Sequence, residues 1–220
     1  MNSFSPNMLK TFEACTQKYY LKYIQKISVP QKNSVFEKGK KVHALANYYL
    51  RGDEITKMEK ALNPEEKQIW EQLKHNEFFQ KHYINSEYNL SCKIGNYWIG
   101  GRLDALMKDE KNYYILDYKT GSIPKNPEYD YQTMVYLLCT LKLLENQTLK
   151  QVQNGTYNIK FVYIDLKNNK NCVIDFSREK ELGYEKRLIE SCNKITDAQF
   201  PEEIEHSKMC EFCEYRKICI

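Results

Sequence analysis

Residues 100–121 read GGRLDALMKDEKNYYILDYKTG, and this stretch decides the fold. Two strand-like runs flank the polar patch Asp109–Asn112, a pattern that is typical of a β-hairpin with a short loop. An even-numbered loop centred on this patch places Asp104 directly opposite Asp117. The sequence therefore predicts that two carboxylates face each other across a strand pair.

Two facing carboxylates repel each other. At about 4 Å and an effective dielectric constant near 20, the repulsion is on the order of 4 kcal/mol. This is a large fraction of the stability of a domain, and a divalent cation between the carboxylates would offset it. Side-chain alternation puts Lys119 on the same strand face as Asp117, while Leu116 and Tyr118 point to the other, apolar face. We expect Asp104, Asp117 and Lys119 to converge on one point.

This combination of groups has a chemical use in phosphodiester hydrolysis. The two carboxylates would hold Mg²⁺ or Mn²⁺, which acidifies a bound water and stabilises negative charge on the phosphate. The lysine would position the attacking water or a phosphoryl oxygen. The competing interpretation is a solvent-exposed hairpin in which Asp117 and Lys119 simply form an ion pair.

Length and composition limit the class of protein. A chain of 220 residues with 42% hydrophobic residues is long enough for one α/β or α+β domain, with or without a small appendage. The net charge of +4 permits nucleic-acid binding without requiring it. No basic segment followed by an apolar run opens the sequence, and no apolar run is long enough to span a membrane. We expect a cytoplasmic protein without a membrane partner, with its eight cysteines reduced.

Apolar spacing predicts helices and strands around the hairpin. The Ser5-Pro6 start indicates a helix over about 6–24 that contains Cys15. The expected helices that follow are 36–50, a stretch from Asn63 to about Tyr83, 131–144, and a helix after Ser177 whose apolar residues include Leu182. The expected strands are 87–93, 157–166 and 171–176.

Four polar residues outside the hairpin are candidates for the same site. His43 lies at the edge of an apolar helical stripe, where a histidine is either structural or a ligand. Glu87 falls near the hairpin, although we favour an ordinary surface-strand position for it. Gln132 and Tyr136 lie four positions apart on one helix face, which could extend along the metal site or be an ordinary helix boundary.

Three of the eight cysteines form a C-x2-C-x5-C cluster at Cys210, Cys213 and Cys219. Reduced thiolates at this spacing indicate a metal site, for which a fourth ligand is needed. The candidates for the fourth ligand are Cys15, Cys92, Cys139, Cys172 and Cys192. The spacing alone does not separate zinc from an iron–sulfur cluster.

Taken together, these motifs resemble the RecB-like branch of the PD-(D/E)xK nuclease superfamily. The resemblance is strongest to its iron–sulfur members, the CRISPR-associated RecB-like exonucleases and the nuclease domains of bacterial helicase-nucleases. It runs nearly end to end, through Ser5–Leu9, Phe12, Cys15, Gly39-x-x-x-His43, Gly101-x-x-Asp104, Asp117-x-Lys119, Gln132-x-x-x-Tyr136 and the final three cysteines. Thr16 departs from the family, whose members often have proline after the first cysteine.

The resemblance implies a restriction-endonuclease-like α/β fold, with a mixed sheet core flanked by helices. It implies one nuclease domain over 1–220, in which the Cys15 region and residues 205–220 form an iron–sulfur subdomain.

The resemblance also implies roles for the site residues. His43, Asp104, Asp117 and the Tyr118 carbonyl would hold Mn²⁺ or Mg²⁺. Lys119 would be the catalytic lysine, and Gln132 and Tyr136 would contact DNA or steady the site. Cys15, Cys210, Cys213 and Cys219 would hold a [4Fe-4S] cluster.

The implied function is a metal-dependent DNA nuclease, in particular an exonuclease acting on single-stranded DNA or DNA ends. The implied partners are DNA and the CRISPR integrase or recombination proteins, in CRISPR adaptation, recombination or repair. The alternative is a non-catalytic DNA-binding or assembly module with a structural metal cluster.

Overall fold

The computed structural model describes residues 3–29, 34–148, 158–200 and 208–219. Its centre is a six-stranded mixed sheet in which five strands follow the order β1-β3-β4-β5-β6 and β2 pairs with β3. The strands are β1 (Ser3–Phe4), β2 (His82–Ile94), β3 (Tyr97–Lys108), β4 (Asn112–Lys119), β5 (Asn158–Asp165) and β6 (Lys170–Asp175). The predicted mixed sheet is confirmed.

The central hairpin has the predicted register. β3 and β4 pair antiparallel, with Ala105 opposite Leu116 and Lys108 opposite Tyr113. The Asp109 carboxylate holds the loop between them, because its Oδ1 accepts the backbone N–H groups of Lys111 and Asn112. β4 and β5 run parallel and are joined through helix α6 (Tyr131–Thr148), while β6 returns antiparallel to β5.

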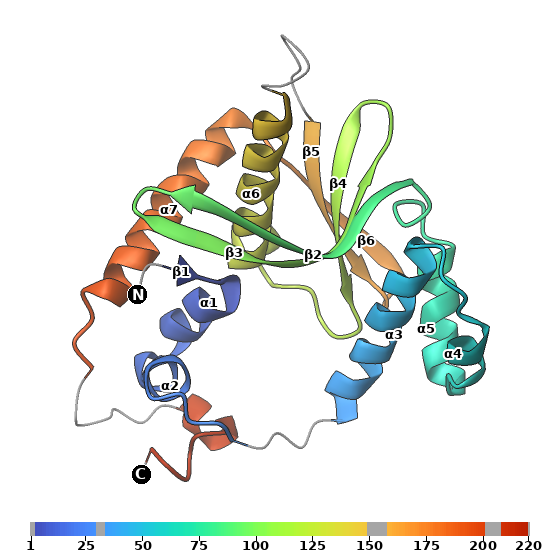
Figure 1. Cartoon of the computed structure of the whole chain (residues 1–220). Coiled ribbons are helices and arrows are strands. Elements are labelled where there is room, and N and C mark those ends of the chain that lie inside the picture. Colours follow the sequence, from blue (N-terminus) through green and yellow to red (C-terminus); the bar gives the residue numbers. More distant parts are fainter. Residues whose placement is uncertain (1–2, 30–33, 149–157, 201–207, 220) are drawn as a thin grey trace.

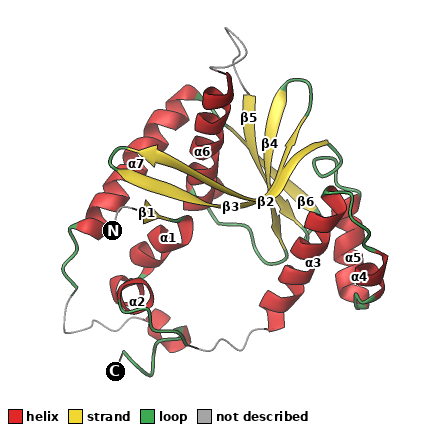
Figure 2. Ribbon diagram, viewed as in Figure 1, coloured by secondary structure: helices red, strands yellow, loops and turns green. Residues whose placement is uncertain are grey.

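Helices cover both faces of the sheet (Figures 1 and 2). On one face, α1 (Pro6–Ala14), α6 and α7 (Arg178–Thr196) share a core with the strands. On the other face, α3 (Ser34–Leu50) and α5 (Pro64–Lys74) enclose a second core with Trp70 at its centre, beside the short α4 (Thr56–Lys60). None of the helices in the described ranges combines the length and the apolar character needed to cross a membrane.

The first predicted helix is interrupted at Cys15. Residue 15 has an extended backbone, with φ −166° and ψ 112°, and it ends α1. Its Sγ accepts the Lys18 N–H at 3.3 Å and so caps the short α2 (Thr16–Tyr19), which continues into the π-helical segment η1 (Tyr20–Ile24). The single helix expected over 6–24 is therefore wrong, because the backbone is extended at Cys15 and a second helix starts there with the thiol as its N-cap.

Two further expectations are corrected. The helix starts after Asn63 as expected, with a capping box between Asn63 and Glu66, but it ends at Lys74, well before Tyr83. Residues beyond it turn so that Phe79 packs edge-to-face on Trp70, and β2 begins at His82. In α7, Leu182 is 57% exposed and does not face the core, although the helix begins after Ser177 as expected and Ser177 is its N-cap.

Two short 3-10 helices complete the described elements. η2 (Pro127–Tyr129) lies just before α6, and η3 (Lys208–Phe212) opens the C-terminal segment. That segment packs on the N-terminal helices: Tyr215 is buried and its hydroxyl donates to the Ile27 carbonyl at 2.9 Å. Lys18 and Glu214 form an ion pair at 2.8 Å. The segment that holds α2 and η1 and the C-terminal segment are thereby brought together.

Candidate active site

The central hairpin opens beside its two aspartates. Backbone pairing between β3 and β4 stops at Ala105 and Leu116, one position before Asp104 and Asp117. In place of the next ladder bond, the Asp104 Oδ2 accepts the Tyr118 N–H at 2.9 Å. The Asp104 side chain is therefore fixed at the point where β3 and β4 separate.

Helix α3 brings His43 to this opening. Its Nδ1 lies 3.2 Å from Asp104 Oδ1, and its Nε2 lies 3.0 Å from the Tyr118 carbonyl oxygen. The helix comes close because Gly39 has no side chain: a Cβ there would lie 3.1 Å from Thr120 Oγ1. Burial lowers the pKa of His43, but the hydrogen bond to Asp104 and its charge outweigh burial and raise that pKa to about 9.

Glu87 of β2 also lies at the opening. Ligand atoms of His43, Glu87 and Asp104 all lie within 4.8 Å of one another. Glu87 falls between the pairs Ser86–Ala105 and Tyr88–Leu103 of the β2–β3 register, which places it opposite Asp104. From the sequence we favoured an ordinary surface-strand position for Glu87, and the structure instead places its carboxylate beside His43 and Asp104. Counting residues outward from the Gly95-Asn96 turn between β2 and β3 places Glu87 opposite Asp104, so the sequence contained this signal.

Asp117 and Lys119 are connected through Gln132 of α6. The Gln132 amide nitrogen donates to Asp117 Oδ1, and its amide oxygen accepts from Lys119 Nζ at 3.3 Å. Lys119 Nζ also lies 2.7 Å from Asp117 Oδ2. The sequence left the role of Gln132 open, and the structure brings its amide into contact with both charged groups.

Asp117 is 3% exposed and is not a member of the His43–Glu87–Asp104 group. Burial and the charge of Asp104 raise the pKa of Asp117 to about 6, although Lys119 and His43 act in the opposite direction. Asp104 and Asp117 therefore repel each other, as expected from the hairpin.

Tyr136 lies one helical turn beyond Gln132 and is buried. Its hydroxyl donates to the Arg102 carbonyl at 2.8 Å, which ties α6 to β3 next to Asp104. The ring can approach because residue 101 is glycine: a Cβ there would lie 2.8 Å from the Tyr136 hydroxyl oxygen. This placement favours a steadying role for Tyr136 over direct contact with DNA.

The donor set suits a hard divalent cation. Carboxylate oxygens, an imidazole nitrogen and a backbone carbonyl are ligands for Mg²⁺ and Mn²⁺. Asp117 Oδ2 is buried, and its partner among the described residues is the Lys119 ammonium group at 2.7 Å, so a second lone pair of this oxygen remains for a cation. These residues fit a cation, which would offset the repulsion between the two aspartates.

The cysteines divide into two sets. Burial and the nearby sulfurs of Cys213, Cys15 and Cys210 raise the pKa of Cys219, so these four side chains share one neighbourhood. The other candidates for a fourth ligand lie elsewhere. Cys92 and Cys139 are buried with their sulfurs 3.0 Å apart, Cys192 is buried in α7, and Cys172 is on β6.

Comparison with known proteins gives the family. No curated protein matches the chain. A crystal structure named “Putative exonuclease” from Eubacterium rectale aligns with a TM-score of 0.58 and 9% identity, over 96% of this chain and 88% of that one. The structure of SSO0001 aligns with a TM-score of 0.48 and 15% identity, over 99% of this chain and 85% of that one. The first of these shows a shared fold. The sequence model of the PD-(D/E)XK nuclease superfamily matches residues 3–220, so the chain belongs to that superfamily.

Proposed function

We propose that this protein is a metal-dependent deoxyribonuclease that degrades single-stranded DNA or DNA ends as an exonuclease. The observation that carries the proposal is the network of Asp117, Gln132 and Lys119 beside the His43–Glu87–Asp104 group. A surface hairpin would leave Asp117 exposed, whereas here it is buried beside a second carboxylate. The name of the Eubacterium rectale protein is in line with exonuclease activity.

In this proposal His43, Asp104, Asp117 and the Tyr118 carbonyl hold one Mn²⁺ or Mg²⁺ ion. Glu87 is added to this set because its carboxylate lies within 4.8 Å of the His43 imidazole and the Asp104 carboxylate. A bound cation supplies a water of lowered pKa and stabilises charge on the phosphate. Lys119 places its ammonium group beside the scissile phosphate. The Gln132 amide fixes the positions of the Lys119 and Asp117 side chains by a hydrogen bond to each. Tyr136 holds β3 in place by the hydrogen bond from its hydroxyl to the Arg102 carbonyl.

We further propose that the chain is one domain of the RecB-like type, closed by a [4Fe-4S] cluster. Cys15, Cys210, Cys213 and Cys219 would be its ligands, and their shared neighbourhood supports this set. Joining the first helices to the C-terminal segment by a cluster would limit fraying of both ends. CRISPR adaptation, recombination and repair are the pathways in which such an enzyme would act, with the CRISPR integrase or recombination proteins as partners.

The activity is tested with labelled single-stranded DNA and Mn²⁺. Asp117→Ala and Lys119→Ala are expected to fold normally and lose degradation, while Lys111→Ala in the hairpin loop retains it. Circular dichroism checks the fold of each variant. Full activity in the purified Asp117 and Lys119 variants would overturn the site. A wild-type protein that binds DNA but never degrades it would favour a non-catalytic module.

The cluster is tested by purification without oxygen. The wild type is expected to be brown with broad absorbance and bound iron, and Cys213→Ala is expected to lose both. Cys172→Ala on β6 is the control, because that thiol lies apart from the four. A colourless preparation that contains stoichiometric zinc would refute the iron–sulfur assignment and leave the nuclease site untouched.

A further inference from the structure

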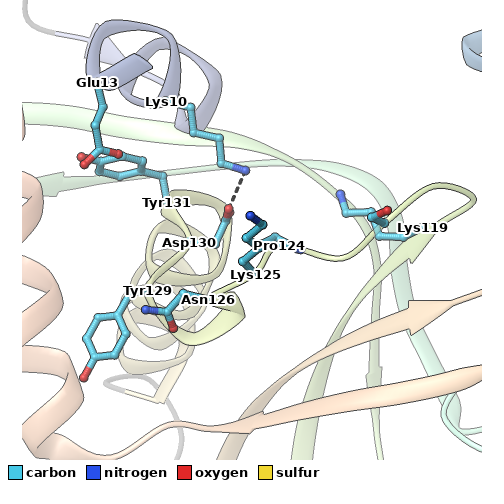
Figure 3. Close-up of a pocket in the computed structure, with 10 residues that line it drawn as sticks. Lys10, Glu13, Lys119, Pro124, Lys125, Asn126, Tyr129, Asp130 and Tyr131 are labelled. Atoms are coloured by element: carbon cyan, nitrogen blue, oxygen red, sulfur yellow. Dashed lines mark ion pairs between the residues drawn. The ribbon is translucent and has the colours of Figure 1, made fainter. Parts of the chain in front are cut away.

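Two cavities adjoin each other beside α1, and Lys119 lines the first of them. The first, of about 520 Å³, is lined by Lys119, by the loop that follows it and by α1 (Figure 3). The second, also about 520 Å³, lies between α1, α6 and α7 and extends to Arg187 and Lys194. Glu13 and Tyr131 line both cavities, so the two form one trough that starts at the catalytic lysine. Each cavity has the volume of a site for a small organic ligand.

The trough has charged sides. Five basic side chains line it against three acidic ones: Lys10, Lys119, Lys125, Arg187 and Lys194 against Glu13, Asp130 and Glu190. Lys10 pairs with Asp130 at 2.8 Å, and Arg187 lies 3.6 Å from Glu13. Figure 3 shows Lys10 reaching down from α1 to Asp130, and Lys125 on the loop between Asp130 and Lys119.

One basic side chain at each end of the trough is free. Lys125 and Lys194 are exposed, and neither has an acidic partner within the described part of the chain. A lysine without an ion-pair partner can bind a phosphate group without first breaking an ion pair. The trough therefore offers a phosphate contact next to Lys119 and another at its far end.

The floor of the trough is apolar. The partly exposed Phe12 lines the second cavity together with the buried Leu9 and Ile195, and the buried Tyr131 lines both cavities. The Arg187 guanidinium lies 5.5 Å from the centre of the Tyr131 ring. Tyr129, which is 47% exposed, adds a further aromatic ring to the first cavity. Aromatic and apolar surfaces bind unstacked bases, whereas a duplex presents mainly its backbone.

We propose that this trough binds a single DNA strand and leads it to Lys119, with Lys125 and Lys194 as phosphate contacts at its two ends. The proposal rests on the proposed nuclease function, which it deepens by naming the path of the strand. Lys194 acts on binding only, because it lies at the far end of the trough from Lys119.

The test measures binding without hydrolysis. The full chain in EDTA is titrated with fluorescein-labelled oligothymidylate, and anisotropy gives the affinity at several salt concentrations. Lys125→Ala and Lys194→Ala are each expected to reduce the slope of log K against log salt by about 0.7, the value for one phosphate contact on a single strand. Lys111→Ala and Lys186→Ala are exposed lysine controls outside the trough and should leave the slope unchanged.

Two outcomes would overturn the trough. One is equal slopes for the trough variants and their controls, and the other is competition by duplex DNA as effective as that by unlabelled single strand. A separate measurement isolates the catalytic site: the wild type should hydrolyse the p-nitrophenyl ester of thymidine 5′-phosphate, and the control Lys186→Ala outside the trough should do so at the same rate. Wild-type protein that binds the strand but hydrolyses neither substrate would refute the nuclease function and leave the trough standing.

Discussion

The imidazole Nδ1 of His43 lies 3.2 Å from the Asp104 carboxylate, although one residue is on α3 and the other is on β3. The same carboxylate accepts the Tyr118 N–H, so Asp104 connects the helix to both strands of the hairpin. This single carboxylate thus joins α3, β3 and β4 in the folded chain.

This contact predicts a pH dependence of stability in the metal-free protein. The pKa of His43 is raised from 6.5 to about 9 on folding, so protonation of the ring favours the folded state. The stabilisation is fully present below pH 6.5 and is lost as pH rises through about 9. We expect the difference in unfolding free energy between wild type and His43→Gln to fall by on the order of 3 kcal/mol over this window. Urea denaturation in EDTA measures it.

The control for this effect removes the partner. In an Asp104→Asn background, the difference between His43 and His43→Gln should vary little with pH, because the charge that outweighs burial is gone. A difference that is just as steep in both backgrounds would assign the pH dependence to another group.

Gln132 is expected to control the rate more than substrate binding. Gln132→Ala removes the amide that holds Asp117 and Lys119 together, so both charged groups lose their alignment. We expect kcat to fall roughly 10- to 100-fold, with the fold retained. Steady-state degradation of labelled single-stranded DNA at saturating Mn²⁺ measures this, with Gln72→Ala on α5 as control. An unchanged kcat would show that the amide has no part in positioning.

Glu87 is expected to contribute to cation affinity. Glu87→Gln keeps the shape of the side chain but removes a charge from the group with His43 and Asp104. We expect the affinity for Mn²⁺ to fall at least about tenfold. Titration calorimetry measures binding directly, and Glu110→Gln in the hairpin loop removes the same charge away from the site. If both variants bind Mn²⁺ as the wild type does, Glu87 serves only its ion pair with Arg102.

Gly101 is expected to be needed for the packing of Tyr136. Gly101→Ala would place a Cβ 2.8 Å from the tyrosine hydroxyl oxygen, which must move and give up its bond to Arg102. We expect a loss of about 1–3 kcal/mol of unfolding free energy. Gly121→Ala is the matched control, because a Cβ there has no atom within 4 Å. Equal stability of the two variants in urea would show that the ring adjusts at no cost.

Local patterns in the sequence determined much of this protein. The hairpin register follows from a loop of known centre, and the helix starts follow from Ser5, Asn63 and Ser177, because each of these side chains accepts a nearby backbone N–H. These features depend on contacts between residues a few positions apart, which a sequence shows directly.

Tertiary packing decided the rest. The approach of Glu87 to His43 depends on residues that are distant in the sequence, and helical spacing did not reveal the break at Cys15 or the end of α5 at Lys74. Helical spacing continues past Lys74, but burial of Phe79 against Trp70 outweighs local propensity there. The sequence by itself determined the hairpin and the carboxylates and lysine that it carries. Only the folded structure brought α3, β2 and α6 around them, because long-range burial sets those positions.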